Sequence, residues 1–249
     1  MPAAAVPLPL PPPVAAGWAL FLDVDGCLVD FADDPAEVVA PPALVGSLLS
    51  LTGRLEGALA LVSGRTIPVL DRMFAPARFP AAGLHGVERR FNGEDLETLQ
   101  PGVPEALPAL VDAAREALAG FPGALVEDKG TAVALHWRAA PAARPVVESF
   151  AGSALPRLPG YRLQPGDSVI ELRPGGADKG TAIAEFLARE PFRGRLPVFA
   201  GDDLTDEHGF EVVNARGGIS ILVGARAGSA ARCSLPDPAA VRAWLGAAA

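Results

Sequence analysis

The chain has 249 residues, of which 50% are hydrophobic and 20% charged, and its formal net charge at pH 7 is −8. This length supports a large core in one or two domains. The acidic balance, without a run of Lys or Arg, argues against nucleic acid or an anionic membrane as the main partner. No apolar run reaches transmembrane length, so we expect a soluble, cytoplasmic protein. We also expect a monomer. Cys27 and Cys233 match no metal-ligand spacing and fit free thiols.

The chain begins with a segment, residues 1–16, that is rich in Ala and Pro and lacks the basic start of a signal peptide. We expect this segment to be a flexible or polyproline-like tail. Up to Arg90, short apolar runs then alternate with amphipathic stretches. The expected strands cover 20–22, 58–62 and 79–83, and the expected helices cover 44–55 and 67–74. This alternation favours a parallel sheet with helices on both faces.

The middle of the chain has a different pattern. Amphipathic helices are expected over 104–118 and 141–155. Each is followed by a hairpin, over 124–137 and 161–172, with turns at Asp128-Lys129-Gly130 and Pro165-Gly166-Asp167. A helix–hairpin–helix–hairpin block of this kind indicates an inserted α+β domain.

After Pro174 the first pattern resumes, with helices expected over 178–189 and 238–245 and strands over 196–200 and 219–223. The sequence therefore predicts an α/β fold with a Rossmann-like parallel sheet. The core domain would be discontinuous, formed by 17–100 and 175–249, and the α+β cap domain would be residues 101–174.

Polar side chains follow the predicted core strands where each strand ends. Ligands of open parallel sheets bind at these carboxyl ends. Carboxylates there could hold Mg²⁺, and a hydroxyl and a lysine could hold a phosphoryl group. The residues at strand ends are Asp23 and Asp25, Ser63, and Asp202 with Asp203, and Lys179 is expected at the first turn of a helix.

Each of these residues also has a plain structural interpretation. An Asp-x-Asp-Gly string is common in ordinary turns. Ser63 could cap a helix, Lys179 could be a solvated surface lysine, and Thr205 with Asp206 could begin a helix.

The motifs, taken in order, resemble those of a known family. The set Asp23-Val24-Asp25-Gly26, Ser63-Gly64-Arg65, Lys179-Gly180 and Gly201-Asp202-Asp203 resembles the haloacid dehalogenase superfamily of phosphatases. More specific stretches resemble trehalose-6-phosphate phosphatases, and the similarity runs from about Trp18 to Val223. These stretches are Gly83-Leu84-His85-Gly86-Val87-Glu88, Glu127-Asp128-Lys129-Gly130, Ala134-Leu135-His136-Trp137-Arg138, Glu171-Leu172-Arg173-Pro174 and Gly201-Asp202-Asp203-Leu204-Thr205-Asp206-Glu207.

The resemblance implies a phosphatase mechanism in two steps. Asp23 would attack phosphorus in line and form an aspartyl-phosphate. Asp25 would protonate the leaving sugar oxygen and then deprotonate the water that hydrolyses the intermediate. Ser63 and Lys179 would neutralise charge on the non-bridging oxygens of the phosphoryl group.

The resemblance also implies a magnesium ion as cofactor. Asp23, the backbone carbonyl of Asp25, and Asp202 would hold it, so that a carboxylate can approach an anionic phosphate. Asp203 and Asp206 would orient Lys179 or water held by the metal. Asp203 is the weaker of the two assignments, because adjacent acids at a strand end seldom both reach a metal.

The same resemblance assigns substrate contacts. Arg65, His85 and Gly86 follow core strands and would lie near the phosphate. In the cap, the sugar contacts would be Glu127, Lys129, Arg138 and Glu171. The alternative is that Glu127, Lys129 and Arg138 form the solvated face of a hairpin, and that His85 and His136 are structural histidines.

The chain departs from the family pattern at two places. Cys27 replaces the usual threonine beside the nucleophile, and Asp167-Ser168 lies where relatives often have lysine. The expected function is Mg²⁺-dependent hydrolysis of trehalose 6-phosphate. One alternative is a phosphatase of another phosphosugar, such as sucrose- or glucosylglycerol-phosphate. The other is a pseudo-phosphatase that binds a phosphosugar without turning it over.

Overall fold

The computed structural model describes residues 8–32, 38–91, 97–98 and 103–247. The chain divides into two compact units. Unit 1 comprises Met1–Thr98 and Asp178–Ala249, and unit 2 comprises Leu99–Ala177. The predicted core–cap boundary at 100/101 and residues 1–7 of the predicted tail lie outside the described residues.

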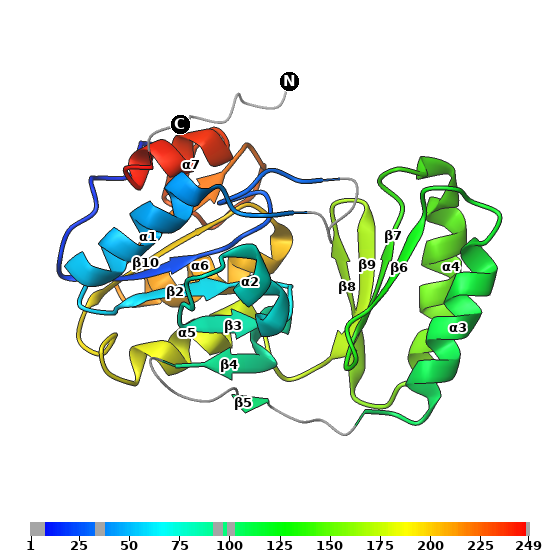
Figure 1. Ribbon diagram of the computed structural model, residues 1–249. Coiled ribbons are helices and arrows are strands. Elements are labelled where there is room, and N and C mark those ends of the chain that lie inside the picture. The colour runs from blue at the N-terminus through cyan, green and yellow to red at the C-terminus, as the bar shows by residue number, and fades with distance from the viewer. Residues whose placement is uncertain (1–7, 33–37, 92–96, 99–102, 248–249) are drawn as a thin grey trace. The chain divides into compact units, whose positions relative to one another are not determined.

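Unit 1 is built around an eight-stranded sheet in the order β12-β11-β10-β1-β2-β3-β4-β5 (Figure 1). The pairs from β12 to β3 are parallel, and β4 and β5 add antiparallel strands. The elements are β1 (Trp18–Leu22), α1 (Pro42–Arg54), β2 (Leu59–Val62), α2 (Ile67–Met73), β3 (Ala81–Gly83), β4 (Glu88–Arg90), β5 (Glu97–Thr98), α5 (Lys179–Leu187), β10 (Leu196–Gly201), α6 (Glu207–Ala215), β11 (Ile219–Val223), β12 (Cys233–Leu235) and α7 (Pro238–Trp244). The predicted α/β class with a parallel core sheet is confirmed.

Side-chain alternation along the central strand sends neighbouring residues to opposite helical layers. On one face, Phe21 packs against Phe186 of α5 with ring centroids 5.9 Å apart. On the other face, Trp18 meets Trp244 of α7 at 6.3 Å. Helix α1 lies beside α7 (Figure 1), and Ser47 donates to Gly246 O. Asp23, two residues after Phe21, therefore belongs to the α5 side of the sheet.

The strand order places a topological switch point between β1 and β10. From β1 the chain adds β2 and β3 on one side, whereas from β10 it adds β11 and β12 on the other. Leu22 is in register with Ala200, so these two strands end at nearly the same level. Ligands of doubly wound sheets bind beyond the carboxyl ends of strands at such a point. Asp23 and Asp202 directly follow the two strands.

The expected flexible or polyproline-like tail is described from residue 8 onward, and its residues 8–16 are hydrogen-bonded to the rest of unit 1. Pro9 O accepts from Ser234 N, and Pro12 O accepts from the Trp244 indole at 2.8 Å. Proline lacks an N–H but keeps its carbonyl, so a Pro-rich segment can still be held through its acceptors.

Unit 2 contains a four-stranded antiparallel sheet in the order β6-β7-β9-β8. Its elements are α3 (Ala106–Leu118), β6 (Leu125–Asp128), β7 (Val133–His136), α4 (Arg144–Ala154), β8 (Tyr161–Gly166) and β9 (Val169–Pro174). Val133, Leu135 and Leu172 pack with Leu110 of α3 and Val147 of α4 in one apolar cluster. The alternate residues, among them Glu127, His136 and Glu171, therefore point to the face without helices.

Two features of the fold were not predicted from sequence. Strands β4, β5 and β12 extend the sheet of unit 1 beyond the expected strands. The β8–β9 turn is also tighter than expected, because Gly166 pairs with Val169 and only Asp167 and Ser168 remain in the loop.

Among the described residues, no helix has both the length and the apolar character needed to cross a membrane.

Candidate active site

Three acidic side chains and one lysine form a buried cluster at the switch point of unit 1. Lys179 Nζ lies 3.0 Å from Asp23 Oδ1 and 2.7 Å from Asp206 Oδ1. One carboxylate oxygen each from Asp23, Asp202 and Asp206 lies within 4.8 Å of the others. The side chains of Asp23, Lys179 and Asp206 are almost fully buried. The structure thus brings together the residues predicted to follow β1, to begin α5 and to follow β10.

Local backbone structure explains how Lys179 and Asp206 are held. Lys179 is the first residue of α5, directly after Asp178, whose side chain caps the helix in a reciprocal pair with Thr181. Asp206 Oδ2 accepts from the backbone N–H groups of Asp202 and Asp203 at 3.0 and 2.9 Å. Asp206 therefore ties the lysine to the loop after β10.

Asp203 has a structural role in this loop. Its side chain accepts from Leu204 N at 2.7 Å and so caps the short 3-10 turn Leu204–Asp206. Arg226 donates to Asp203 O at 3.2 Å. These contacts fix the loop that carries Asp202.

The charges in the cluster are strongly coupled. Burial, followed by the charge of Asp206, raises the pKa of Asp202 to about 7 and raises the pKa of Asp23 well above its usual value. Burial alone would lower the pKa of Lys179, but the carboxylates of Asp206 and Asp23 raise it above the usual range. The surroundings therefore favour the charged form of Lys179 and disfavour the charged forms of Asp23 and Asp202.

The donor set fits a divalent cation. Asp202 Oδ1 is buried and has no hydrogen-bond partner among the described residues. Both oxygens of Asp206 are already engaged by Lys179 and by backbone N–H groups. Asp23 and Asp202 therefore remain as the side chains available to a hard cation, which prefers oxygen ligands. A cation there would relieve the cost of burying these acids.

Gly26 allows the loop after β1 to approach Asp202. Its φ is +73°, and a Cβ built on it would lie 2.2 Å from Asp202 Oδ2. Left-handed backbone costs an L-residue about 1–2 kcal/mol. The overlap with Asp202 comes in addition to that strain, so glycine is required here for two separate reasons.

Substitution of Gly26 separates these two reasons experimentally. We expect Gly26→Ala to lower the phosphatase activity expected from the resemblance about 100-fold, because Asp202 must move by a large fraction of an ångström. Gly228→Ala is the matched control, since Gly228 has φ +75° and open space around its Cβ position. Both variants carry the backbone strain, so Gly228→Ala should lose some stability in urea unfolding and keep its activity, whereas Gly26→Ala should lose more stability because of the overlap. Equal activities would show that the overlap is unimportant.

A second group of predicted residues meets around Arg65. Arg65 Nε and Nη2 donate to the two carboxylate oxygens of Asp25 at 2.7 and 2.6 Å. Ser63 Oγ accepts from Arg65 N at 3.1 Å and is buried. Helix α2 is capped by Thr66, so Ser63 is not a helix cap. The predicted acid–base residue is therefore held by a bidentate partner.

His85 and Gly86 lie beside this group. His85 N donates to Ser63 O at 2.9 Å. A Cβ on Gly64 would lie 2.8 Å from two atoms of the His85 ring, so the ring covers that glycine. His85 has φ 54° and Gly86 has φ +103°, and this left-handed backbone turns the ring back over Gly64.

In unit 2, three of the four predicted sugar contacts form one cluster. Lys129 Nζ lies 3.3 Å from Glu171 Oε1 and 3.9 Å from Glu127 Oε2. Glu127 and Glu171 lie on either side of Ala134 in the same cross-strand row. Arg138 lies near the end of the sheet and pairs with Asp167 at 2.9 Å.

Sequence reasoning missed one member of this cluster. His136 Nε2 lies 3.0 Å from Glu127 Oε2, although the sequence suggested only a structural histidine. The register pairs Leu125 with His136, which makes Glu127 and His136 diagonal neighbours. The hairpin pattern, read with its register, would have identified this contact.

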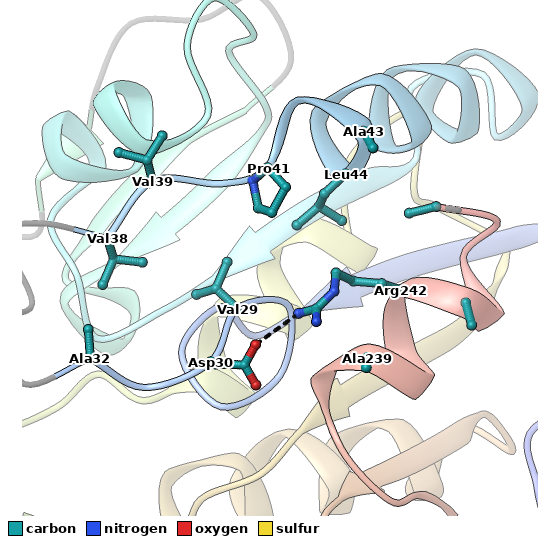
Figure 2. A pocket seen from close by; sticks show the side chains of 12 residues that line it. Val29, Asp30, Ala32, Val38, Val39, Pro41, Ala43, Leu44, Ala239 and Arg242 are labelled. Atoms are coloured by element: carbon teal, nitrogen blue, oxygen red, sulfur yellow. Dashed lines mark hydrogen bonds and ion pairs between the residues drawn. The ribbon is translucent and has the colours of Figure 1, made fainter. Parts of the chain in front are cut away.

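An apolar cavity of about 480 Å³ lies elsewhere in unit 1 (Figure 2). Its wall includes Val29, Val38 and Leu44, and Arg242 pairs across it with Asp30 at 3.4 Å. Its described lining includes none of the predicted site residues. The polar cluster is therefore distinct from this cavity.

Comparison with known proteins identifies the family. Residues 21–238 match the Trehalose-phosphatase family. The chain belongs to the trehalose-phosphatase family. It is accordingly a phosphoric monoester hydrolase, as the resemblance implied.

Relatives in the trehalose-phosphatase family align over nearly the whole chain. A protein of Sinorhizobium fredii (strain NBRC 101917 / NGR234) named "Probable trehalose-phosphate phosphatase" is 45% identical over 235 residues, 93% of this chain and 88% of that protein. The "Trehalose-6-phosphate phosphatase" of Escherichia coli (strain K12) is 42% identical over 243 residues, 96% of this chain and 89% of that protein.

Solved structures support the fold. The C-terminal domain of Candida albicans trehalose-6-phosphate phosphatase superposes with a TM-score of 0.79 at 21% identity, covering 91% of this chain and 90% of that one. At that identity the likeness shows the fold. A trehalose-6-phosphate phosphatase related protein has a TM-score of 0.71 at 27% identity, covering 91% of this chain and 95% of that one.

Proposed function

We propose that this protein hydrolyses trehalose 6-phosphate to trehalose and inorganic phosphate with Mg²⁺ as cofactor. The observation that carries the proposal is the buried cluster of Asp23, Lys179, Asp206 and Asp202 in a chain of the trehalose-phosphatase family. A carboxylate beside a fixed cation and further acids is the arrangement that phosphoryl transfer through an enzyme-bound intermediate needs.

In the first step Asp23 attacks phosphorus in line, and the bond from phosphorus to the sugar oxygen breaks. The products are an aspartyl-phosphate and the free sugar, whose oxygen takes a proton from Asp25. In the present geometry both Asp25 oxygens accept from Arg65. Asp25 must therefore exchange at least one of these contacts for the leaving oxygen.

In the second step Asp25 accepts a proton from water, and the water oxygen attacks the aspartyl-phosphate. The bond from phosphorus to Asp23 breaks, and inorganic phosphate leaves. Lys179 and Ser63 would donate to the non-bridging oxygens in both steps, where negative charge builds up. Lys179 is suited to this role because it stays charged.

Asp23, Asp202 and the backbone carbonyl of Asp25 would hold the magnesium ion. When bound, it would supply positive charge that lets the Asp23 carboxylate approach an anionic phosphate. The buried Asp202 oxygen without a hydrogen-bond partner among the described residues supports a cation site here, as do the raised pKa values of Asp202 and Asp23, which are caused first by burial.

The sugar would be bound by the Glu127–Lys129–Glu171 cluster of unit 2. Sugar hydroxyls both donate and accept, so a site with two carboxylates and an ammonium suits them. Arg138, which pairs with Asp167 at 2.9 Å, would contact the same glucose unit, the one remote from the phosphate. In this proposal unit 2 is the cap that sets substrate specificity.

A phosphate-release assay over a panel of phosphosugars tests the function. The panel contains trehalose 6-phosphate, sucrose 6-phosphate, glucosylglycerol phosphate and glucose 6-phosphate, each with Mg²⁺ and with a chelator. We expect kcat/KM to be highest for trehalose 6-phosphate and to vanish without the metal. A better sucrose or glucosylglycerol substrate would overturn the proposed substrate. Phosphorylated protein without phosphate release would indicate a binding protein instead.

Replacement of Glu171 tests the sugar site. We expect Glu171→Ala to lower kcat/KM for trehalose 6-phosphate about 10- to 100-fold, the effect of losing a charged hydrogen bond. Hydrolysis of p-nitrophenyl phosphate, which lacks a sugar, should change less than about threefold.

The control is Glu148→Ala. This change removes an exposed glutamate of α4 that pairs at 2.7 Å with Arg144, four residues earlier in the same helix. This variant should leave both substrates unaffected. Equal losses for both substrates in Glu171→Ala would remove Glu171 from the sugar site.

A further inference from the structure

His136 occupies a defined place on the polar face of unit 2. It lies on β7 and contacts Glu127 of β6 across a diagonal of the hairpin, with Nε2 3.0 Å from Oε2. Glu127 Oε2 also lies 3.9 Å from Lys129 Nζ. Both contacts use the same carboxylate oxygen, so together they fix the rotation of the carboxylate about its last bond.

His136 also affects the electrostatics of Glu127. Two carboxylates, Glu127 and Glu171, face one ammonium, Lys129. Burial acts to raise the pKa of Glu127, but the hydrogen bond from His136 and the charge of Lys129 outweigh it, so the net shift is downward. Arginines near this cluster have partners of their own: Arg138 pairs with Asp167, and Arg162 and Arg173 donate to Ala177 O at 3.1 and 2.8 Å.

We propose that His136 is a positioning residue for substrate binding, whose Nε2–H holds the Glu127 carboxylate so that Oε1 can accept from a sugar hydroxyl. This inference rests on the proposed sugar role of the unit 2 cluster. His136 itself touches Glu127 and acts through it.

The test compares His136→Ala, which removes the donor, with His136→Gln, whose amide N–H can replace it. KM and kcat are measured for trehalose 6-phosphate and for p-nitrophenyl phosphate from pH 4.5 to 8, together with Tm. His208→Ala is the matched control, because His208 is exposed on α6.

We expect His136→Ala to raise KM for trehalose 6-phosphate about tenfold with kcat changed less than twofold. Values for p-nitrophenyl phosphate should not change. The acid limb of the pH profile of 1/KM should also move to higher pH, because loss of the His136 hydrogen bond leaves burial to raise the pKa of Glu127. His136→Gln should restore most of the affinity.

A merely structural histidine would give a different result. His136→Ala would then lower Tm and reduce the turnover of both substrates, with no shift of the pH profile, and the inference would be wrong. It would also be wrong if Glu127→Ala raised KM while His136→Ala did not. Failure of the wild-type enzyme to prefer trehalose 6-phosphate would instead count against the proposed function, and it would be seen before any variant is made.

Discussion

Replacement of Asp23 by asparagine is expected to lower kcat at least about 10⁴-fold, because an amide cannot replace the carboxylate nucleophile. The fold should survive. Burial raises the pKa of Asp23 well above its usual value, so folding at pH 7 disfavours its charged form. Asparagine removes that cost, and Tm should be equal to or above that of the wild-type protein. Phosphate release and thermal unfolding check the two parts of this prediction.

The control for Asp23→Asn is Asp112→Asn in α3, where the aspartate side chain is 76% exposed and pairs with Arg115. This change should leave both activity and Tm unaltered. Retention of more than one per cent of activity in Asp23→Asn would show that another group attacks phosphorus. In that event the proposed aspartyl-phosphate would have to be abandoned.

Replacement of Asp206 by alanine is expected to have the second largest effect. It removes the acceptor of three donors: Lys179 Nζ and the backbone N–H groups of Asp202 and Asp203. Breaking a buried, hydrogen-bonded charge pair costs about 3–5 kcal/mol, and here Asp23 still partners Lys179, so a loss of about 3 kcal/mol in unfolding free energy is expected. Activity should fall more than 100-fold, since Lys179 and the loop carrying Asp202 lose their common anchor.

Asp206→Asn separates stability from catalysis. Its amide oxygen can still accept from the loop N–H groups, but its NH₂ group would face Lys179. We therefore expect Asp206→Asn to recover part of the lost stability in urea unfolding without recovering activity. Wild-type activity in Asp206→Ala would contradict the anchoring role of Asp206.

The sequence predicted the core of unit 1 well, because its strands are short apolar runs that end in polar residues. Leu20, Leu22 and Leu61 are fully or almost fully buried, and the predicted acids follow their strands directly. Strand β4 was missed because Glu88-Arg89-Arg90 resembles a charged loop. Its arginines are nevertheless buried, through pairs with Glu185 and Asp71. Ion pairs between residues that are far apart in the sequence cannot be predicted from the local sequence pattern.

The local sequence pattern also predicted the β8–β9 turn at the wrong residues. Pro165 and Gly166 are the usual turn residues, so the loop was expected there. The observed loop is Asp167-Ser168, with Ser168 at φ 59°, because pairing continues to Gly166 opposite Val169. In the site, the sequence identified Asp25 and Arg65 individually but not their bidentate pairing. Side-chain pairing across 40 residues depends on rotamers that only tertiary packing selects.

The proline-rich segment at the start of the chain forms hydrogen bonds with β12, the outer strand of the unit 1 sheet. Ser234 of β12 donates its backbone N–H to Pro9 O and its hydroxyl to Leu8 O. An uncovered outer strand is a template for pairing with other molecules. Prolines satisfy such a strand through their carbonyls, yet they offer few N–H groups of their own to recruit another strand. The segment therefore makes it harder for the β12 edges of two copies of the protein to pair and aggregate.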